Sequence, residues 1–548
     1  MGIHTLVVGI DAACWPVVER LPDRSAVSTI ERLGDRGVAA PLESAIPPWT
    51  ASAWPSLYTG TNPGKHGVFG FLRFDGYDWD VVNATDLRAR PVWELADRNG
   101  LTSAVVNAPV THPPRSFDGA LVPGYTAPED PECHPPGLLD DVRDRVGDYR
   151  LYSEGDVERE SAAADYRGFV RSRGAAFRYL ADRFDPEFGF VQFQQTDTVC
   201  HEFPADEDLL GAVYGAVDDE IAAILDACDP DTVILASDHG IGPCEGREFR
   251  VNEFLRERGF VETATDGDGM PTWVSIREGR LRGGGSSGEE GGVSGVPGAA
   301  EALESAMGVA ARAGLTTQRA ARVVDALGLT EAVSAVVPDD LQRAGAERVD
   351  FRASAAYVRD PIELGVRINL AGRDPEGVVD PDEYESVRRD LIEALQSVRT
   401  PDGDPVFEDV APREAYFHGP EAERAVDVVT VPADFDQYLV AQLYGDRFGE
   451  PSEPWTHKRT GMVVAAGDAV DAEAGTGDPH LFDVAPTVCA ALGIPRSDRM
   501  DGSPLPFVEP TDERRYPPRE ARERVRTDDD RVTETLADLG YIDRTQDD

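Results

Sequence analysis

Five short apolar segments constrain the fold of this chain more than any other feature. They are residues 5–10, 102–107, 188–194, 232–236 and 462–466. Continuous apolar runs of this length, rich in β-branched residues, are typical of strands buried on both faces of a parallel sheet. The stretches between them place apolar residues at helical spacing. Strands that alternate with helices predict an α/β fold with a doubly wound, mostly parallel sheet flanked by helices.

The alternating pattern breaks in the middle of the chain, which predicts an insertion. With 548 residues, the chain is long enough for about two to four domains, or for one large domain with an insertion. Residues 279–298 are rich in glycine, which predicts a surface loop. We expect residues 1–261 and 441–508 to form the sheet core, residues 262–440 an inserted cap region, and residues 509–548 a charged tail.

The composition is strongly acidic, with a formal charge of −48. Lys65 and Lys458 are its only lysines, so the other basic residues are arginines. An acidic excess with almost no lysine is typical of extreme halophiles, where it keeps a protein soluble although salt screens each charge over short distances. We therefore expect a halophilic protein. Nucleic acid is not expected as a partner, because phosphate backbones require a basic surface.

The sequence shows neither a membrane span nor a signal peptide. It has no apolar run of the roughly eighteen residues that a span requires, and the N-terminus has no basic region before its first predicted strand. The six cysteines form no CxxC pair, and a disulfide framework is not expected at this size without a secretory signal. These features predict a soluble cytoplasmic protein.

Side chains that could bind metal ions lie at or near the ends of the predicted strands. They are Asp11, Asp197, His201, Asp238, His239 and His457. Ligands of open α/β sheets bind just outside the carboxyl ends of the strands, so we expect these side chains to meet in one cleft. Each residue alone is a weak signal, since an aspartate at a strand end is more often a helix cap or a loop residue. Together they are enough for two divalent cations.

Six segments resemble the type I phosphodiesterase/nucleotide pyrophosphatase branch of the alkaline phosphatase superfamily. They are VVGIDAACW (7–15), IPPWTASAWPSLYTGTNPGKHGVFGF (46–71), FQQTDTVCHEF (193–203), ILASDHGIGP (234–243), WTHKRTGMVVAAG (455–467) and HLFDVAPTVCAALGIP (480–495). They occur in the order of the family and cover the sheet core but not the middle region. The resemblance implies an alkaline phosphatase-like fold and a metal-dependent phosphohydrolase.

The resemblance also implies two metal sites and one nucleophile. The first site would consist of Asp11, Asp238, His239 and the hydroxyl oxygen of Thr50, and the second of Asp197, His201 and His457. A mixed Asp/His set suits zinc, with manganese or another divalent ion as alternatives. The Thr50 hydroxyl would attack phosphorus and form a phospho-threonine, which water would then hydrolyse.

Three further residues are candidates for contacts with the substrate. Lys65 and Lys458 both flank the proposed site, where a compact cationic head could contact phosphate. Many nucleotide pyrophosphatases have a phosphate-binding asparagine where this chain has Phe71, which puts ordinary nucleotide recognition in doubt. Asn107 could supply the missing amide, although a turn residue at a strand end is the stronger interpretation.

We therefore expect a hydrolase of phosphoric ester or anhydride bonds, with phosphodiesterase-like activity on a small-molecule phosphate ester or a nucleotide. Two alternatives stay open. A phosphomutase or a phosphomonoesterase could use the same two-metal site, and a non-catalytic, metal-stabilised binding protein could use the same fold. A sulfatase is disfavoured, because residues 50–54 lack the Cys/Ser-x-Pro-x-Arg signature. The sequence leaves the oligomeric state open.

Overall fold

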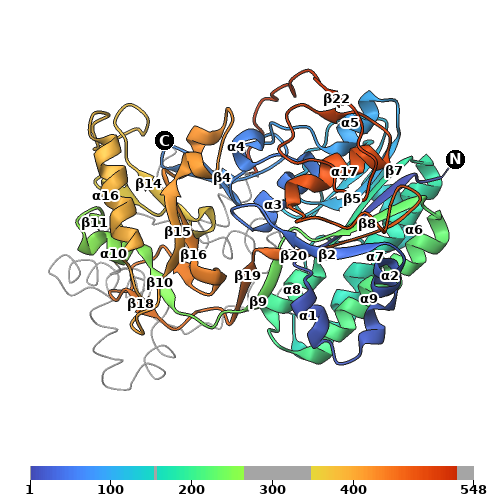
Figure 1. Ribbon diagram of the computed structural model, residues 1–548, viewed down its shortest axis with the longest axis horizontal. Helices are drawn as coiled ribbons and strands as arrows, with labels where there is room; N and C mark the ends of the chain where they lie inside the picture. The colour runs from blue at the N-terminus through green and yellow to red at the C-terminus, as the bar shows by residue number, and fades with distance from the viewer. Residues whose placement is uncertain (1, 154–156, 265–346, 528–548) are drawn as a thin grey trace, which may run out of the picture.

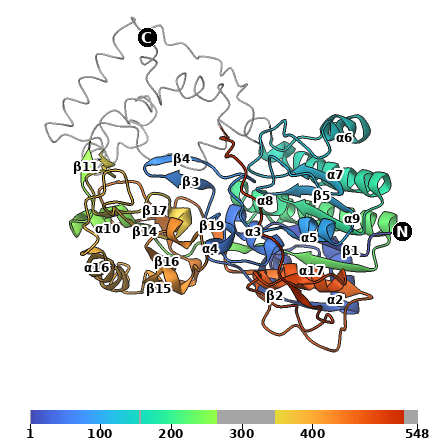
Figure 2. The ribbon, with the colours of Figure 1, turned by 90° about the horizontal axis from the view of Figure 1, so that it is seen from above.

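The computed structural model describes residues 2–153, 157–264 and 347–527. The glycine-rich segment 279–298 lies outside the described residues, as do all residues of the predicted cap from 265 to 346. The described chain forms two lobes that lie side by side (Figure 1, Figure 2). Each lobe has its own sheet and its own buried apolar cluster.

The larger lobe is built on a seven-stranded sheet with the strand order β2-β20-β8-β1-β7-β5-β6. The strands are β1 (Thr5–Ile10), β2 (Val38–Glu43), β5 (Ser103–Ala108), β6 (Gly119–Pro123), β7 (Phe188–Phe193), β8 (Thr232–Ala236) and β20 (Thr460–Gly467). β20 pairs antiparallel with both of its neighbours, whereas the five strands from β8 to β6 are parallel. The predicted α/β fold with a mostly parallel sheet is confirmed.

Helices cover both faces of this sheet (Figure 1). One face carries α1 (Trp15–Arg20), α2 (Ser28–Arg36), α7 (Arg159–Phe184), α8 (Gln195–Glu202) and α9 (Glu207–Cys228). The other carries α3 (Thr50–Thr59), α5 (Val92–Arg98) and α17 (Val484–Ala491). In α9 the N-cap Asp206 accepts a hydrogen bond from the Leu209 N–H at 3.0 Å. The first turn also contains acidic residues, whose negative charge interacts favourably with the positive end of the helix dipole.

The smaller lobe has a four-stranded antiparallel sheet with the order β13-β14-β16-β15. Its elements are β13 (Ala356–Tyr357), β14 (Gly365–Ile368), β15 (Phe407–Pro412), β16 (Val428–Pro432) and the helix α16 (Tyr384–Gln396). The chain enters this lobe through β10 (Glu248–Arg250) and α10 (Val251–Glu257), and Phe249 and Phe254 belong to its core. Its apolar cluster is therefore assembled from segments well separated in sequence.

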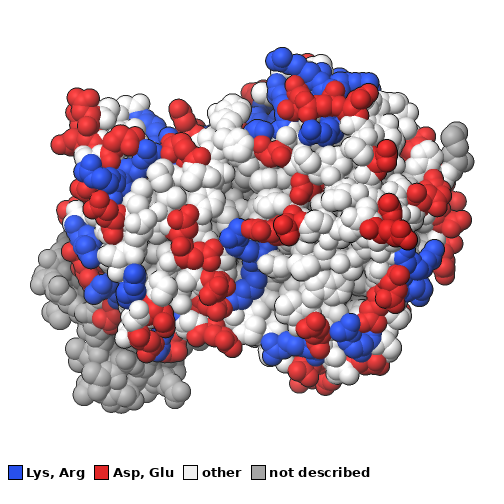
Figure 3. Space-filling model, viewed as in Figure 1, with Lys and Arg blue, Asp and Glu red and all other residues white. Residues whose placement is uncertain are grey.

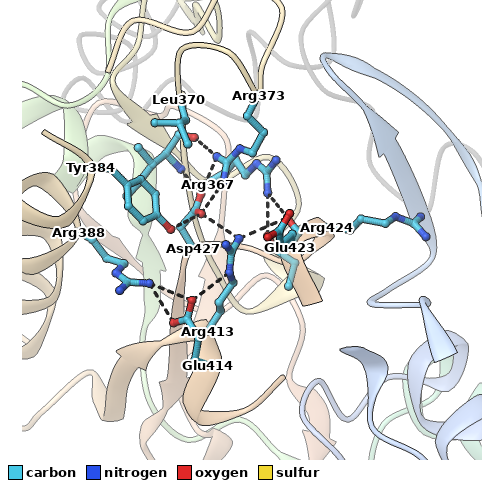
Figure 4. A network of polar contacts seen from close by, with 12 residues as sticks. Arg367, Leu370, Arg373, Tyr384, Arg388, Arg413, Glu414, Glu423, Arg424 and Asp427 are labelled. Atoms are coloured by element: carbon cyan, nitrogen blue, oxygen red, sulfur yellow. Dashed lines mark hydrogen bonds and ion pairs between the residues drawn. The ribbon is translucent and has the colours of Figure 1, made fainter. Parts of the chain in front are cut away.

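A buried carboxylate organises the polar contacts of the smaller lobe (Figure 4). Asp427 accepts hydrogen bonds from the Arg373 guanidinium at 2.6 and 2.9 Å, from the Tyr384 hydroxyl at 2.8 Å and from the Ile368 N–H at 2.8 Å. Burial raises the pKa of this carboxyl, but the hydrogen bonds from Arg373 and the charge of Arg367 hold the net pKa below its ordinary value. The charged carboxylate thus ties α16 and β14 together.

Two further segments connect distant parts of the molecule. The hairpin of β3 (Leu72–Asp75) and β4 (Asp78–Val81) extends towards the smaller lobe, where the Tyr77 hydroxyl donates to Asn369 Oδ1 at 2.9 Å (Figure 2). The described part of the tail runs along the larger lobe, and Arg519 pairs with Glu94 at 2.7 Å.

The surface carries many acidic side chains. In the view of Figure 3 they are spread over both lobes, with basic side chains between them. Among the described helices, none is both long and apolar enough to cross a bilayer.

Candidate active site

The six predicted Asp and His residues meet at the carboxyl ends of β1, β7 and β8. Asp11 directly follows β1, and Asp238 and His239 follow β8 after one intervening residue. Asp197 and His201 lie in the first and last turns of α8, which begins two residues after β7. His457 lies in β19 (Trp455–Lys458), which pairs antiparallel with β9 (Gly240–Pro243) just beyond β8. The topology therefore brings residues more than 400 positions apart to one edge of the sheet.

The first cluster consists of Asp11, Asp238 and His239, all of which are fully buried. The Nε2 atom of His239 lies 3.6 Å from Asp11 Oδ1 and 3.2 Å from Asp238 Oδ2. The Thr50 hydroxyl oxygen lies 3.5 Å from the same Nε2 atom. One possible ligand atom from each of the three residues lies within 4.8 Å of the other two, so the group could hold a metal ion.

The second cluster consists of Asp197, His201 and His457. Asp197 Oδ1 lies 3.3 Å from His201 Nε2 and 3.5 Å from His457 Nε2, and the two Nε2 atoms are 3.0 Å apart. The rings of His239 and His457 stack with centroids 3.9 Å apart, which places the two clusters against each other. Asp197, His239 and His457 also form a group that could hold a metal ion.

The other ring nitrogen of each histidine has an acceptor of its own. The acceptors facing Nδ1 are Glu453 Oε2 for His201, the Gly240 carbonyl for His239 and the Pro48 carbonyl for His457, at 3.1, 3.0 and 3.0 Å. A proton on Nδ1 would satisfy these oxygens and fix the ring orientation, leaving Nε2 to act as a metal ligand. All three imidazoles are therefore oriented for coordination through Nε2.

Three carboxylate oxygens in the clusters are buried and accept no hydrogen bond from the described residues. They are Asp11 Oδ1, Asp197 Oδ1 and Asp238 Oδ2. These are the same oxygens that face the histidine Nε2 atoms. Buried polar atoms normally have partners, and buried charges are normally paired or coordinate metals. The donor set therefore fits bound divalent cations.

The electrostatics of the clusters agree with this fit. Burial, Asp238 and Asp197 raise the pKa of Asp11 well above its ordinary value. Burial, together with the neighbouring His239, lowers the pKa of His457 far below its ordinary range, so this imidazole is neutral. Burial lowers the pKa of His201, but Asp197 and Glu453 outweigh it and raise the pKa to about 10. A cation at this site would displace that proton, because metal ligands must be deprotonated.

Thr50 is the first residue of α3 rather than its N-cap, which is Trp49. The Thr50 residue is 2% exposed, and its hydroxyl points at the first cluster. The N-terminus of α3, which favours negative charge, lies beside the same hydroxyl.

The two lysines make ion pairs outside the clusters. Lys65 Nζ donates to Asp501 at 2.5 Å, and Lys458 Nζ donates to Asp436. Asn107 is buried and has a positive φ of 63°. Its amide donates to Gln192 Oε1 at 2.5 Å. Their contacts with a substrate stay predictions.

Three residues that we did not predict support the clusters. Trp54 Nε1 and Gln192 Nε2 donate to Asp11 Oδ2 at 3.0 and 2.6 Å, which directs the other oxygen of Asp11 towards His239. Glu453 lies behind His201. Gln192 could have been found as a polar residue inside an otherwise apolar strand, whereas no sequence signal marks Glu453.

A pocket lies beside the second cluster, and Asp197 and His201 form part of its wall.

The chain is similar to a known protein family and to several solved structures. Residues 5–290, just over half of the chain, match the family model described as type I phosphodiesterase / nucleotide pyrophosphatase. Among proteins with curated annotation, none matches this sequence.

Several solved structures are similar. The alkaline phosphatase PafA is 15% identical, with a TM-score of 0.50 over 93% of this chain and 99% of that chain. A phosphonoacetate hydrolase from Sinorhizobium meliloti 1021, in complex with phosphonoacetate, is 15% identical, with a TM-score of 0.48 over 88% and 94% of the two chains. Murine ectonucleotide pyrophosphatase / phosphodiesterase 5, in complex with AMP, is 13% identical, with a TM-score of 0.47 over 90% and 96%. The likeness to PafA shows the alkaline phosphatase-like fold.

Proposed function

This chain belongs to the type I phosphodiesterase/nucleotide pyrophosphatase family and is a hydrolase of phosphoric ester bonds, and we propose that it uses two divalent cations and Thr50 as its nucleophile. The observation that carries the proposal is the set of three buried carboxylate oxygens that face histidine Nε2 atoms and accept no hydrogen bond from the described residues. Without cations, each of these charged oxygens would be buried at a large cost in free energy.

The two cations would have different ligands. One would be held by Asp11, Asp238, His239 and the Thr50 oxygen, and the other by Asp197, His201 and His457. The mixed oxygen and nitrogen donors favour zinc, with manganese as the main alternative. Cations bound at these positions would lower the pKa of the Thr50 hydroxyl and neutralise charge on the oxygens of the phosphoryl group.

The residues of the chain then carry the chemistry. The Thr50 oxygen attacks phosphorus, the alcohol leaves, and the phosphoryl group is transferred to Thr50. Water cleaves this phospho-threonine and regenerates the hydroxyl. The N-terminus of α3 stabilises the phosphoryl anion, and Trp54 and Gln192 keep Asp11 oriented throughout. Small-molecule phosphate esters, and phosphodiesters in particular, are the substrates that fit the family.

The proposal is tested by replacing the nucleophile and a matched threonine of the same helix. With bis-p-nitrophenyl phosphate and p-nitrophenyl phosphate as substrates, at high salt with zinc or manganese, Thr50→Ala should lower kcat by on the order of a thousandfold or more. Thr59→Ala removes a buried hydroxyl that bonds Pro55 O at 2.6 Å at the other end of α3, so its activity should be retained.

Two further measurements complete the test. Acid quenching during turnover, followed by peptide mass spectrometry, should find the phosphoryl group on residue 50, and metal analysis should find two divalent ions per chain. Undiminished activity in Thr50→Ala would refute the nucleophile. Purified active enzyme without divalent ions would refute the metal sites. Return of the phosphoryl group to a sugar phosphate, without release of free phosphate, would identify a mutase instead.

A further inference from the structure

We propose that the pocket beside Asp197 and His201 binds an alkylammonium group on the alcohol part of the phosphate ester. The inference rests on the proposed function, because the pocket and the second cluster share these two residues. A group bound in the pocket would therefore be connected to the reacting phosphate by a short linker. The argument depends on which side chains form the wall and on which atoms they offer.

Aromatic rings form much of the wall. They belong to Tyr125, Tyr152, Tyr166 and Phe169. All four side chains are buried, and the rings of Tyr125 and Tyr152 contact each other with centroids 5.8 Å apart. The Tyr152 hydroxyl is held by the Ala127 carbonyl at 2.8 Å. The faces of aromatic rings attract cations, and quaternary ammonium groups are recognised by such rings.

Two polar side chains of the wall, Gln195 and Glu202, offer acceptor atoms. Gln195 is 6% exposed, and its Oε1 atom accepts no hydrogen bond from the described residues. The carboxylate of Glu202 lines the same pocket and accepts a hydrogen bond from the Tyr166 hydroxyl at 2.5 Å. An unpaired buried acceptor and a carboxylate together favour a ligand that brings positive charge or N–H donors.

Basic side chains are missing from the described part of this wall, which includes neither lysine nor arginine. A second phosphate, as in a nucleoside diphosphate, would find no cationic partner there and would be repelled by Glu202. The Arg173 guanidinium lies 5.2 Å from the Phe169 ring centroid, so Phe169 already has a cationic neighbour. The three tyrosines and Glu202 are therefore the expected contacts of an alkylammonium group.

The test compares two phosphodiesters that share a p-nitrophenyl leaving group. One carries choline, and the other carries 3,3-dimethylbutanol, in which carbon replaces the charged nitrogen at almost the same volume. We expect kcat/KM to be about tenfold or more higher for the choline ester. Glu202→Gln and Tyr125→Leu should each bring this ratio towards one. Glu207→Gln, which removes an exposed carboxylate at the start of α9, should leave the ratio unchanged.

The outcomes separate this inference from the proposed function. A ratio of one or less in the wild-type enzyme would overturn the alkylammonium site, as would a clear preference for the p-nitrophenyl ester of a nucleotide over both compounds. If no ester is cleaved, the proposed function fails. The pocket is then tested by calorimetric titration with phosphorylcholine and with 3,3-dimethylbutyl phosphate in the presence of zinc. Tighter binding of phosphorylcholine would support the site, and equal affinity would overturn it.

Discussion

Gly9 lies in β1 beneath the candidate site, and replacing it with alanine tests how packing orients Asp11. A Cβ atom at this position would lie 2.4 Å from Trp54 Cη2, 2.7 Å from Trp54 Cζ3 and 3.2 Å from Gln192 Cγ. Ordinary contacts begin at 3.4 Å, so the indole would have to move by about 1 Å. Trp54 is fully buried and packs edge-on against Phe190, which leaves it no free space. Overpacking of this kind costs about 1–3 kcal/mol.

The displacement would also affect the site directly. The two side chains that the new methyl group contacts, Trp54 and Gln192, are the two that donate hydrogen bonds to Asp11 Oδ2. Residues that orient a metal ligand typically contribute about 10–100-fold to metal affinity. Gly9→Ala should therefore lower both the free energy of unfolding and the affinity for zinc or manganese.

The assay is denaturant unfolding at fixed high salt, combined with metal competition against a chromogenic chelator. Gly168→Ala is the control, because Gly168 lies inside α7 and a Cβ atom there has nothing within 4 Å. This variant should gain about 0.5–1 kcal/mol of stability and keep its metal affinity. If Gly9→Ala has the same free energy of unfolding as the wild-type protein, the packing argument is refuted. Lost stability with unchanged metal affinity would refute the link to Asp11.

Three further predictions concern metal binding and pH. Glu453→Ala removes the acceptor of His201 Nδ1 and should lower metal affinity by about 10–100-fold. Glu450→Ala, which removes an exposed carboxylate nearby in the sequence, should not change the metal affinity. If the two variants bind metal equally well, Glu453 does not have this role. Chelation should lower the unfolding temperature, and zinc or manganese in large excess over Kd should restore about 3 kcal/mol; a chelator without effect would contradict bound cations. Burial and Glu363 raise the pKa of Asp360 to about 7, so the folded state holds this proton more tightly than the unfolded state, and stability falls as pH rises from about 4 to 7. Asp360→Asn should therefore be more stable than wild type at pH 8 but not at pH 4, and a pH-independent difference in unfolding midpoint would refute the assignment.

The sequence predicted those elements whose own residues determine them. β1 and β8 have the predicted bounds, because a strand buried on both faces is continuously apolar. β2 was not predicted, since it is an edge strand whose burial alternates and which contains Pro41. The antiparallel direction of β20 depends on how the chain returns from the smaller lobe, and no local pattern records that path.

The candidate site was predictable to a similar degree. The residues at strand ends predicted a cleft, but the assignment of His457 to the second metal site rested on the resemblance, because its partners lie more than 200 residues away. The rarity of Lys65 and Lys458 attracted attention, yet rarity says nothing about which groups a side chain contacts. The orientation of the histidines by Glu453 and by backbone carbonyls requires the three-dimensional structure.

The place of β20 has a consequence for how the protein is made. This strand lies between β2 and β8, so the ribosome has already passed residue 460 before the sheet can close. A nascent chain that stops earlier would present two unpaired inner edges, which are templates for aggregation. The segment that identifies the family, residues 5–290, is therefore not a unit that could be expressed or transplanted alone. Any shortened version of the protein must keep β20 together with the strands on either side of it.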